Sequence, residues 1–156
     1  PDAVVGDVLS QRDGAETDDG FHITLFYGKR RVILRSNSFI QGATPRFELH
    51  ATRGSYLKYG MDPQEARLAS GQTIDAAIGQ EEAVNYGYLQ LADHPAERLA
   101  TLPGNYLGFY KALAEGLKTG DVPVDLTDAL KTMQIIEAVR LSSEKGRKIF
   151  RKEWEQ

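Results

Sequence analysis

Residues 21–38 read FHITLFYGKRRVILRSNS, and this stretch decides the fold class. Up to Tyr27, apolar residues at odd positions alternate with His22 and Thr24, a period of two that places successive side chains on opposite faces of a β-strand. The alternation resumes after the turn at Gly28 and continues to Ser38. The stretch therefore predicts a β-hairpin.

Further strands are predicted on both sides of this hairpin. Residues 4–10 are rich in β-branched side chains and lead into a polar loop. Residues 46–51 and 55–58 form a second predicted pair, with Gly54 in the turn as the residue expected to supply a positive φ. Residues 84–91 and 98–102 are the remaining candidate strands.

Three helices are predicted from capping residues and apolar spacing. Asp62 and Pro63 are typical of a helix start, and Gly71 ends that short helix. A second helix is expected over residues 105–118, and a third begins at Asp125. Hairpins dominate and no helix links the early strands, so the sequence predicts an α+β fold with a largely antiparallel open sheet and helices packed on one face.

Length and composition favour a single domain over residues 1–156. Cysteine is absent, which excludes disulfides and thiolate chemistry and agrees with a cytoplasmic location. A formal net charge of -3 gives no overall basic surface for nucleic acid, and the apolar runs are too short to span a membrane. We therefore expect no nucleic-acid partner and no membrane partner.

The motifs of nucleotide and metal chemistry are missing from the sequence. No Gly-x-Gly-x-x-Gly turn follows a strand, and no Gly-Lys-Ser/Thr loop occurs. The three histidines are widely separated, so no local metal-ligand spacing exists. The residues themselves predict no catalytic, cofactor-binding or metal-binding motif in this chain.

Several segments together resemble the C-terminal domain of the Gfo/Idh/MocA family of NAD(P)-dependent oxidoreductases, most of all its scyllo-inositol dehydrogenase-like members. The likeness covers essentially the whole chain and is most specific over His50–Glu65. The segments that carry it are Phe21–Gly28, Phe47–Glu65, Gly104–Tyr106 with Phe109 and Tyr110, Pro123–Val124, Ala129–Leu130 and Ile135–Ala138.

The resemblance implies a fold like the C-terminal domain of glyceraldehyde-3-phosphate dehydrogenase and a role as a substrate and dimerisation domain. It also implies an N-terminal Rossmann domain, absent from this chain, that binds NAD or NADP. The family's catalytic Glu-Lys-Pro motif and its catalytic Asp and His have no counterpart here. The resemblance thus implies half of a sugar or polyol oxidoreductase acting on CH–OH groups, with no cofactor of its own and no activity in isolation.

Candidate functional residues follow from this expected division of labour. One set is expected to line a substrate site: Lys58, Tyr59, Asp62, Tyr86 and Tyr88. The tyrosines combine an apolar ring with a polar hydroxyl, although strand and helix core positions are the simpler explanation for most of them. A second set is expected on the sheet face that forms a homodimer: His22, Thr24 and Arg35.

One alternative stays open on sequence grounds. The chain begins at Pro1 without an initiator Met, and a preceding domain is therefore expected. Without such a domain, the same features would fit a free-standing dimeric α+β module that binds a small ligand or regulates a partner.

Overall fold

The chain forms two compact units in the computed structural model, which describes residues 1–75 and 77–155. The first unit consists of Pro1–Ile40 together with the chain from Val124 onward, and the second consists of Gln41–Pro123. Each unit contains a four-stranded sheet in which every pairing between described strands is antiparallel. The predicted α+β class with antiparallel pairing is confirmed, and the strands are divided between two sheets.

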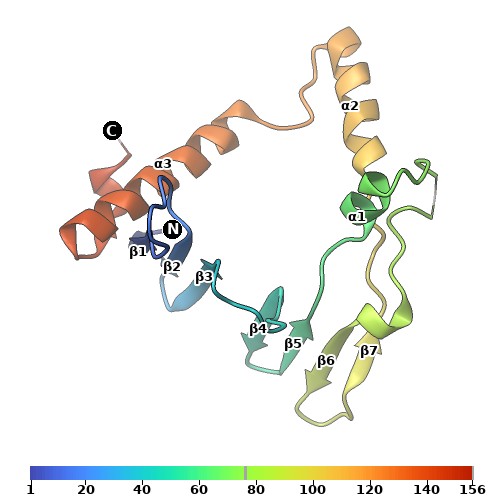
Figure 1. The fold of residues 1–156 in the computed structure, drawn as a ribbon, viewed down its shortest axis with the longest axis horizontal. Coiled ribbons are helices and arrows are strands. Elements are labelled where there is room, and N and C mark those ends of the chain that lie inside the picture. Colours follow the sequence, from blue (N-terminus) through green and yellow to red (C-terminus); the bar gives the residue numbers. More distant parts are fainter. Residues whose placement is uncertain (76, 156) are drawn as a thin grey trace. The chain divides into compact units, whose positions relative to one another are not determined.

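The first unit is built from a sheet and one long helix (Figure 1). The sheet has the order β3–β2–β1–β8. Its elements are β1 (Ala3–Leu9), β2 (Gly20–Tyr27), β3 (Arg30–Asn37), α3 (Leu126–Lys145), β8 (Ile149–Phe150) and the short 3-10 helix η2 (Arg151–Glu153). The β2–β3 hairpin confirms the prediction from residues 21–38, and Gly28 in its turn has a φ of +57°.

Helix α3 covers one face of the first sheet. Val4 of β1 and Ile149 of β8 are fully buried there, in a cluster with Leu25 of β2 and with Ala138 and Val139 of α3. Burial of such side chains contributes roughly 1.5–3 kcal/mol each relative to leaving them exposed. This cluster is the core of the first unit, and it fixes which face of the sheet remains open.

Gly6 and two serines bring α3 close to strand β1. A Cβ at Gly6 would lie 2.6 Å from the Val139 carbonyl oxygen, so only glycine permits this approach. The backbone N–H of Gly6 donates to Ser142 Oγ at 3.0 Å, and that of Val8 donates to Ser143 Oγ at 2.9 Å. Because β8 pairs with only the first part of β1, these hydroxyls satisfy donors of β1 beyond the short strand.

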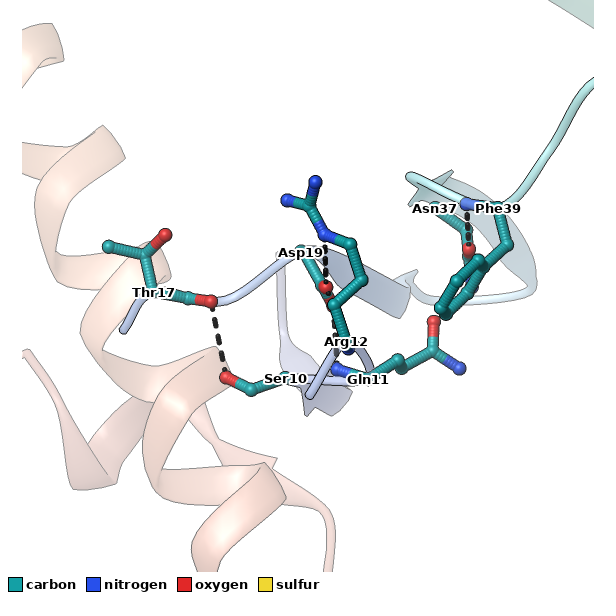
Figure 2. Close-up of polar contacts among 7 residues, drawn as sticks. All are labelled: Ser10, Gln11, Arg12, Thr17, Asp19, Asn37 and Phe39. Atoms are coloured by element: carbon teal, nitrogen blue, oxygen red, sulfur yellow. Dashed lines mark hydrogen bonds and ion pairs between the residues drawn. The ribbon is translucent and has the colours of Figure 1, made fainter. Parts of the chain in front are cut away.

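The loop between β1 and β2 is closed by Asp19 (Figure 2). Its carboxylate accepts hydrogen bonds from the backbone N–H of Gln11 at 2.8 Å and of Arg12 at 3.0 Å, and from Arg12 Nε at 3.0 Å. Donation from the Gln11 backbone, helped by Arg12, holds the pKa of the Asp19 carboxyl below its ordinary value. Ser10 Oγ donates to the Thr17 carbonyl at 3.2 Å across the same loop.

The second unit contains a smaller sheet with the order β4–β5–β6–β7 and two helices. The sheet strands cover the two predicted segments near residue 50 and a shortened form of residues 84–91, and the last strand overlaps the predicted residues 98–102 only at Arg98 and Leu99. The elements are β4 (Phe47–Ala51), β5 (Gly54–Lys58), α1 (Gln64–Ala69), the 3-10 helix η1 (Ala83–Asn85), β6 (Gly87–Leu91), β7 (Glu97–Leu99) and α2 (Tyr106–Thr119).

Gly54 does not have the positive φ that the sequence suggested. It begins β5 and pairs with Leu91 of β6, and its φ is not positive. A Cβ at this position would collide with the Gln90 carbonyl oxygen and with Leu91. The physical reason for glycine here is therefore the close approach of strand β6 and not the conformation of the turn.

Helix α2 begins and ends as the sequence predicted, but its apolar stripe is exposed. Asn105 caps its start by accepting from the Gly108 backbone N–H at 2.8 Å, and Gly120 follows its end with a φ of +87°. No residue of α2 is buried, and Leu117 is 82% exposed. The expectation that both long helices cover one sheet holds for α3, whereas α2 belongs to the second unit.

Candidate functional site

A pocket of about 320 Å³ lies in the second unit. The segments that form it are the strand pair β4–β5, the turn before α1, the loop before η1, and the chain between β7 and α2. Its lining residues are Arg46, Phe47, Lys58, Gly60, Met61, Asp62, Gly79, Glu81, Thr101, Leu102 and Tyr106. The volume lies at the lower end of the range for small-molecule sites, and charged and apolar groups share the wall.

Lys58 and Glu81 form a buried ion pair in the pocket wall. The Lys58 side chain is 7% exposed and that of Glu81 is 4% exposed. Lys58 Nζ lies 2.8 Å from Glu81 Oε2, and it donates also to the carbonyl of Asn85 at 2.9 Å. The ammonium thus ties the end of β5 to the segment around η1. Its hydrogen bonds are made within the protein, so the role of Lys58 in the wall is to hold this side of the pocket in place.

Gln64 connects two segments that line the pocket. Its side chain is buried, its Nε2 donates to Asp62 Oδ1 at 2.9 Å, and its Oε1 accepts from the backbone N–H of Tyr106 at 2.9 Å. The backbone N–H of Gln64 also donates to Asp62 Oδ1, at 2.8 Å. One amide therefore fixes the starts of both α1 and α2, and with them two lining residues.

Glycines allow the segments around Gln64 to cross closely. A Cβ at Gly104 would collide with the Asp62 carboxylate and with the Gln64 amide. A Cβ at Gly79 would in turn collide with the Gly104 backbone, whose N–H donates to the Gly79 carbonyl at 3.3 Å. The segments around Gly79, a lining residue, and Gly104 thus cross so closely that a side chain at either glycine would push them apart.

Thr101 leaves one polar atom without a partner. Its Oγ1 is buried and has no hydrogen-bond partner among the described residues. A buried hydroxyl without a partner costs roughly 1–3 kcal/mol, so such groups are exceptional in folded proteins. Asp62 Oδ1 accepts two hydrogen bonds, both from Gln64. The wall therefore offers a hydroxyl and a carboxylate close to the charged pair Lys58 and Glu81.

The structure separates the five predicted substrate-lining residues into two that line the pocket and three that do not. Lys58 and Asp62 line the pocket, whereas Tyr59, Tyr86 and Tyr88 are not among its lining residues. Tyr59 is 43% exposed, and Tyr86 is half-buried after η1. The Tyr88 ring carries the Arg98 guanidinium 4.6 Å from its centroid, and the Tyr88 hydroxyl accepts from Arg98. Their roles toward a substrate stay predictions.

Sequence reasoning missed three residues of the site: Gln64, Glu81 and Thr101. Gln64 stands at the predicted helix start, which gave it a local explanation and concealed its contact with Tyr106. Glu81 lies in a loop, 23 positions from its partner Lys58. The only sequence feature that marks Glu81 is the pair Glu81-Glu82 close to a tyrosine-rich strand, and no sequence feature marks Thr101.

A second, shallow depression of about 450 Å³ lies beside α1 in the same unit. Arg67 lines it and donates through Nη1 to the carbonyls of Ala77, Ile78 and Gln80 at 3.0, 2.9 and 2.8 Å. This guanidinium satisfies loop carbonyls, which explains its position without a ligand.

The three predicted dimer-face residues lie together on the first sheet. His22 pairs with Arg35 across β2 and β3, and Thr24 pairs with Ile33 two positions along. These positions alternate with Leu25, which packs against α3, so they occupy the opposite, open face. His22 and Arg35 are exposed, and Thr24 is half-buried. Whether a partner covers this face stays a prediction.

Two further findings concern the described part of the chain. Within residues 1–75 and 77–155, no three His, Cys, Asp or Glu side chains come together as a group that could hold a metal ion. No helix in these ranges combines the length and apolar character needed to cross a bilayer.

Comparisons with known proteins agree with this architecture. The family model described as "Oxidoreductase family, C-terminal alpha/beta domain" (Gfo/Idh/MocA) matches residues 2–150. The chain is 36% identical over 155 residues to scyllo-inositol 2-dehydrogenase (NADP(+)) IolW of Bacillus subtilis (strain 168), covering 96% of this chain and 43% of that protein. It is 35% identical over 147 residues to the uncharacterised oxidoreductase YdgJ of Escherichia coli (strain K12), covering 88% and 40%.

Solved structures give the same result. The oxidoreductase yvaA of Bacillus subtilis superposes with a TM-score of 0.90 at 36% identity, over 96% of this chain and 45% of that one. The oxidoreductase YPO2259 of Yersinia pestis gives a TM-score of 0.88 at 33% identity, over 96% and 44%. The chain thus spans less than half the length of the relatives it matches. It belongs to the Gfo/Idh/MocA oxidoreductase family and corresponds to the C-terminal alpha/beta domain of that family.

Proposed function

We propose that this chain is the substrate-binding and dimerisation domain of an NAD(P)-dependent oxidoreductase that acts on the CH–OH group of a sugar or polyol. Family membership supports the oxidoreductase part of this proposal. The name of the relative from Bacillus subtilis, a scyllo-inositol 2-dehydrogenase, supports a polyol as the substrate class. The pocket of the second unit is the observation that carries the proposal.

The pocket suits a small molecule that is rich in hydroxyl groups. Its volume of about 320 Å³ is enough for a ligand of monosaccharide size. The Asp62 carboxylate can accept hydrogen bonds from ligand hydroxyls, and Arg46 is a donor in the same wall. Apolar surface from Phe47, Leu102 and the Tyr106 ring can pack against the C–H face of a sugar ring.

Within this proposal the predicted lining residues have separate roles. Asp62 contacts the ligand, and Lys58 holds the wall through Glu81. Tyr59, Tyr86 and Tyr88 lie outside the pocket lining, and they would reach a substrate only as the outer part of a larger site. A larger site is expected, because in this proposal another part of the longer protein supplies the opposite wall.

The dinucleotide would be bound by that other part of the longer protein. NAD and NADP are held at the turn between a parallel strand and the helix that follows it. The pairings between the described strands are all antiparallel, and no Gly-x-Gly-x-x-Gly occurs in the sequence, so the residues of this chain do not fit a dinucleotide. Hydride transfer is chemistry of the cofactor, and this chain should therefore be inactive alone.

The open face of the first sheet is the proposed homodimer interface, with His22, Thr24 and Arg35 in it. A sheet with one face covered by a helix and one face exposed commonly gains a partner, and matching faces give an isologous dimer. We place the protein in the cytoplasm, in keeping with the absence of cysteine.

Substitution of Asp62 tests the role of the pocket. In the full-length protein that contains this chain, Asp62→Asn should raise KM for a polyol substrate about 10-fold and leave the Kd for NADPH unchanged, because a charged acceptor is lost only on the substrate side. Asp93→Asn, in an exposed turn, is the matched control. An unchanged KM in a stably folded Asp62→Asn protein would exclude this pocket as the substrate wall.

A further inference from the structure

The two carboxylate oxygens of Asp62 have unequal partners. Oδ1 accepts two hydrogen bonds, from the backbone N–H of Gln64 at 2.8 Å and from Gln64 Nε2 at 2.9 Å. No described residue donates to Oδ2, and Asp62 forms no ion pair with a described cation. Asp62 is exposed and lines the pocket, so Oδ2 is the oxygen left for a ligand.

The side-chain amide of Gln64 can be oriented in only one way. Its Oε1 accepts from the backbone N–H of Tyr106 at 2.9 Å, while its Nε2 donates to Asp62. Rotation of the amide by half a turn would place an oxygen against the carboxylate and an NH2 group against an N–H, so both contacts would become repulsive. The start of α2 therefore fixes a donor against one oxygen of the carboxylate.

Gly104 limits the carboxylate from another side. A Cβ at this position would collide with Asp62 Oδ2 and with Gln64 Nε2, so both groups lie directly against the backbone of the segment before α2. This close packing leaves the carboxylate little room to turn. Two donors at Oδ1 and a backbone contact at Oδ2 thus hold the free oxygen in a fixed position.

The other charged residues of the lining offer no comparable acceptor. Glu81 accepts from Lys58 Nζ through both carboxylate oxygens, at 2.9 and 2.8 Å, and its side chain is only 4% exposed. Arg46 and Lys58 can only donate. Among the described lining residues, Asp62 Oδ2 is therefore the one charged acceptor that remains for a substrate hydroxyl.

We infer that Asp62 binds a single hydroxyl of the substrate through Oδ2, and that Gln64 is the positioning residue that occupies Oδ1. A free carboxylate can accept from two adjacent hydroxyls of a polyol, one at each oxygen. Asp62 offers one oxygen, with the backbone of Gly104 against it. The pocket thus discriminates between substrates by the position of one hydroxyl. The inference deepens the proposed function and rests on it, because it specifies the contact that Asp62 makes.

Single-deoxy analogues provide the test, with kcat/KM measured for the full-length protein. The probes are the inositol or hexose that the protein oxidises fastest and its analogues that lack one hydroxyl at a carbon other than the reacting one. Loss of the hydroxyl that Asp62 binds should lower kcat/KM about 10- to 100-fold, because a hydrogen bond to a charged group is lost. In Asp62→Asn this factor should shrink about 5-fold, since a neutral amide replaces the charged acceptor, and the factors for the other hydroxyls should not change.

Gln64→Met tests the positioning role. Met keeps the length of the side chain and removes the Nε2 donor, so Asp62 Oδ1 retains only the backbone donor and can accept from a substrate. Dependence on Asp62 should therefore extend to a second, neighbouring hydroxyl. A purely structural role of Gln64 would lower kcat/KM for every analogue by the same factor. Gln72→Met, at an exposed position, is the matched control.

Three results would overturn the inference alone. Deoxy analogues with the same relative kcat/KM in the wild type and in Asp62→Asn would show that Asp62 binds no substrate hydroxyl. Two hydroxyls that depend equally on Asp62 in the wild type would show that both oxygens bind substrate. A Gln64→Met protein with the wild-type pattern would show that Gln64 does not position the carboxylate.

Two further points keep the test decisive. The comparison of the wild type with Asp62→Asn decides the single-hydroxyl contact even where Gln64→Met does not fold. A full-length protein that binds NADPH but oxidises no inositol or hexose would contradict the proposed function itself, and the inference would fall with it.

Discussion

The side-chain oxygen of Gln64 accepts a hydrogen bond from the backbone N–H of Tyr106 at 2.9 Å, across 42 positions of sequence. This contact connects the start of α1 to the start of α2. A helix leaves its first N–H groups without intrahelical partners, and Gln64 supplies one of the missing acceptors from a different helix. The geometry of the proposed substrate pocket therefore depends on a buried amide that is not itself one of the lining residues.

Replacement of Gln64 should destabilise the second unit. Gln64→Leu keeps a similar volume but leaves the Tyr106 N–H and the Asp62 carboxylate without this partner, at a cost of about 1–3 kcal/mol. Urea denaturation of the full-length protein measures the change. Gln72→Leu, at an exposed position, is the control and should stay within about 0.5 kcal/mol of the wild type. Equal stability of the two variants would show that the hydrogen bonds of Gln64 to Asp62 and Tyr106 do not stabilise the second unit.

Alanine at Gly104 should destabilise the protein more than alanine at Gly42. The new Cβ would collide with the side chains of Asp62 and Gln64, so these side chains must shift, with an expected loss of about 1–3 kcal/mol. Gly42→Ala is the matched control, because no atom lies within 4 Å of a Cβ at Gly42. Thermal denaturation of both variants checks the prediction, which fails if Gly104→Ala is as stable as Gly42→Ala.

Single and double substitutions at the buried pair Lys58 and Glu81 should change the free energy of unfolding by different amounts. Lys58→Met leaves the Glu81 carboxylate buried without its partner and should cost about 3–5 kcal/mol. The double variant K58M/E81L removes both charges and should recover most of that loss. A double-mutant cycle in urea measures the coupling. Additive losses would mean that the two groups act independently in the folded protein.

Acid should weaken the C-terminal end of the first unit through Glu153. Hydrogen bonding to Arg147, together with donation from the Phe150 backbone N–H, lowers the pKa of the Glu153 carboxyl from 4.5 to about 2. The folded-state pKa lies below the unfolded value, so this contribution is complete above pH 4.5 and is lost as pH falls toward 2. Glu153→Gln should therefore reduce the free energy of unfolding near neutral pH. Between pH 4.5 and pH 2 the variant should lose less stability than the wild type. Parallel pH profiles for variant and wild type would contradict the assignment.

The parts of the fold that rest on local pattern were predictable from the sequence. The alternation up to Tyr27 identified the hairpin, and Asn105 and Asp125 marked the starts of α2 and α3 because their side chains cap those helices. The role of Gly54 was predicted wrongly, because glycine is needed there for the close approach of β6, which is distant in sequence. Local patterns carry no information about such approaches.

Much of the candidate site could not be predicted, for the same physical reason. Lys58 and Asp62 were selected by their position between a strand and a helix, and both line the pocket. Glu81 and Gln64 act through partners that only the folded chain brings near. The exposed stripe of α2 shows a further limit, since helical periodicity predicts an apolar face but does not identify what covers it.

Dinucleotide binding by the full-length protein tests the central claim most directly. NADH and NADPH fluorescence is titrated against the full-length protein and against residues 1–156, followed by an assay of dinucleotide reduction with a panel of polyols and sugars. The account predicts that the full-length protein binds a dinucleotide and oxidises at least one polyol or sugar, while the 156-residue chain does neither. A full-length protein that binds neither dinucleotide, or a chain that binds one alone, would contradict it.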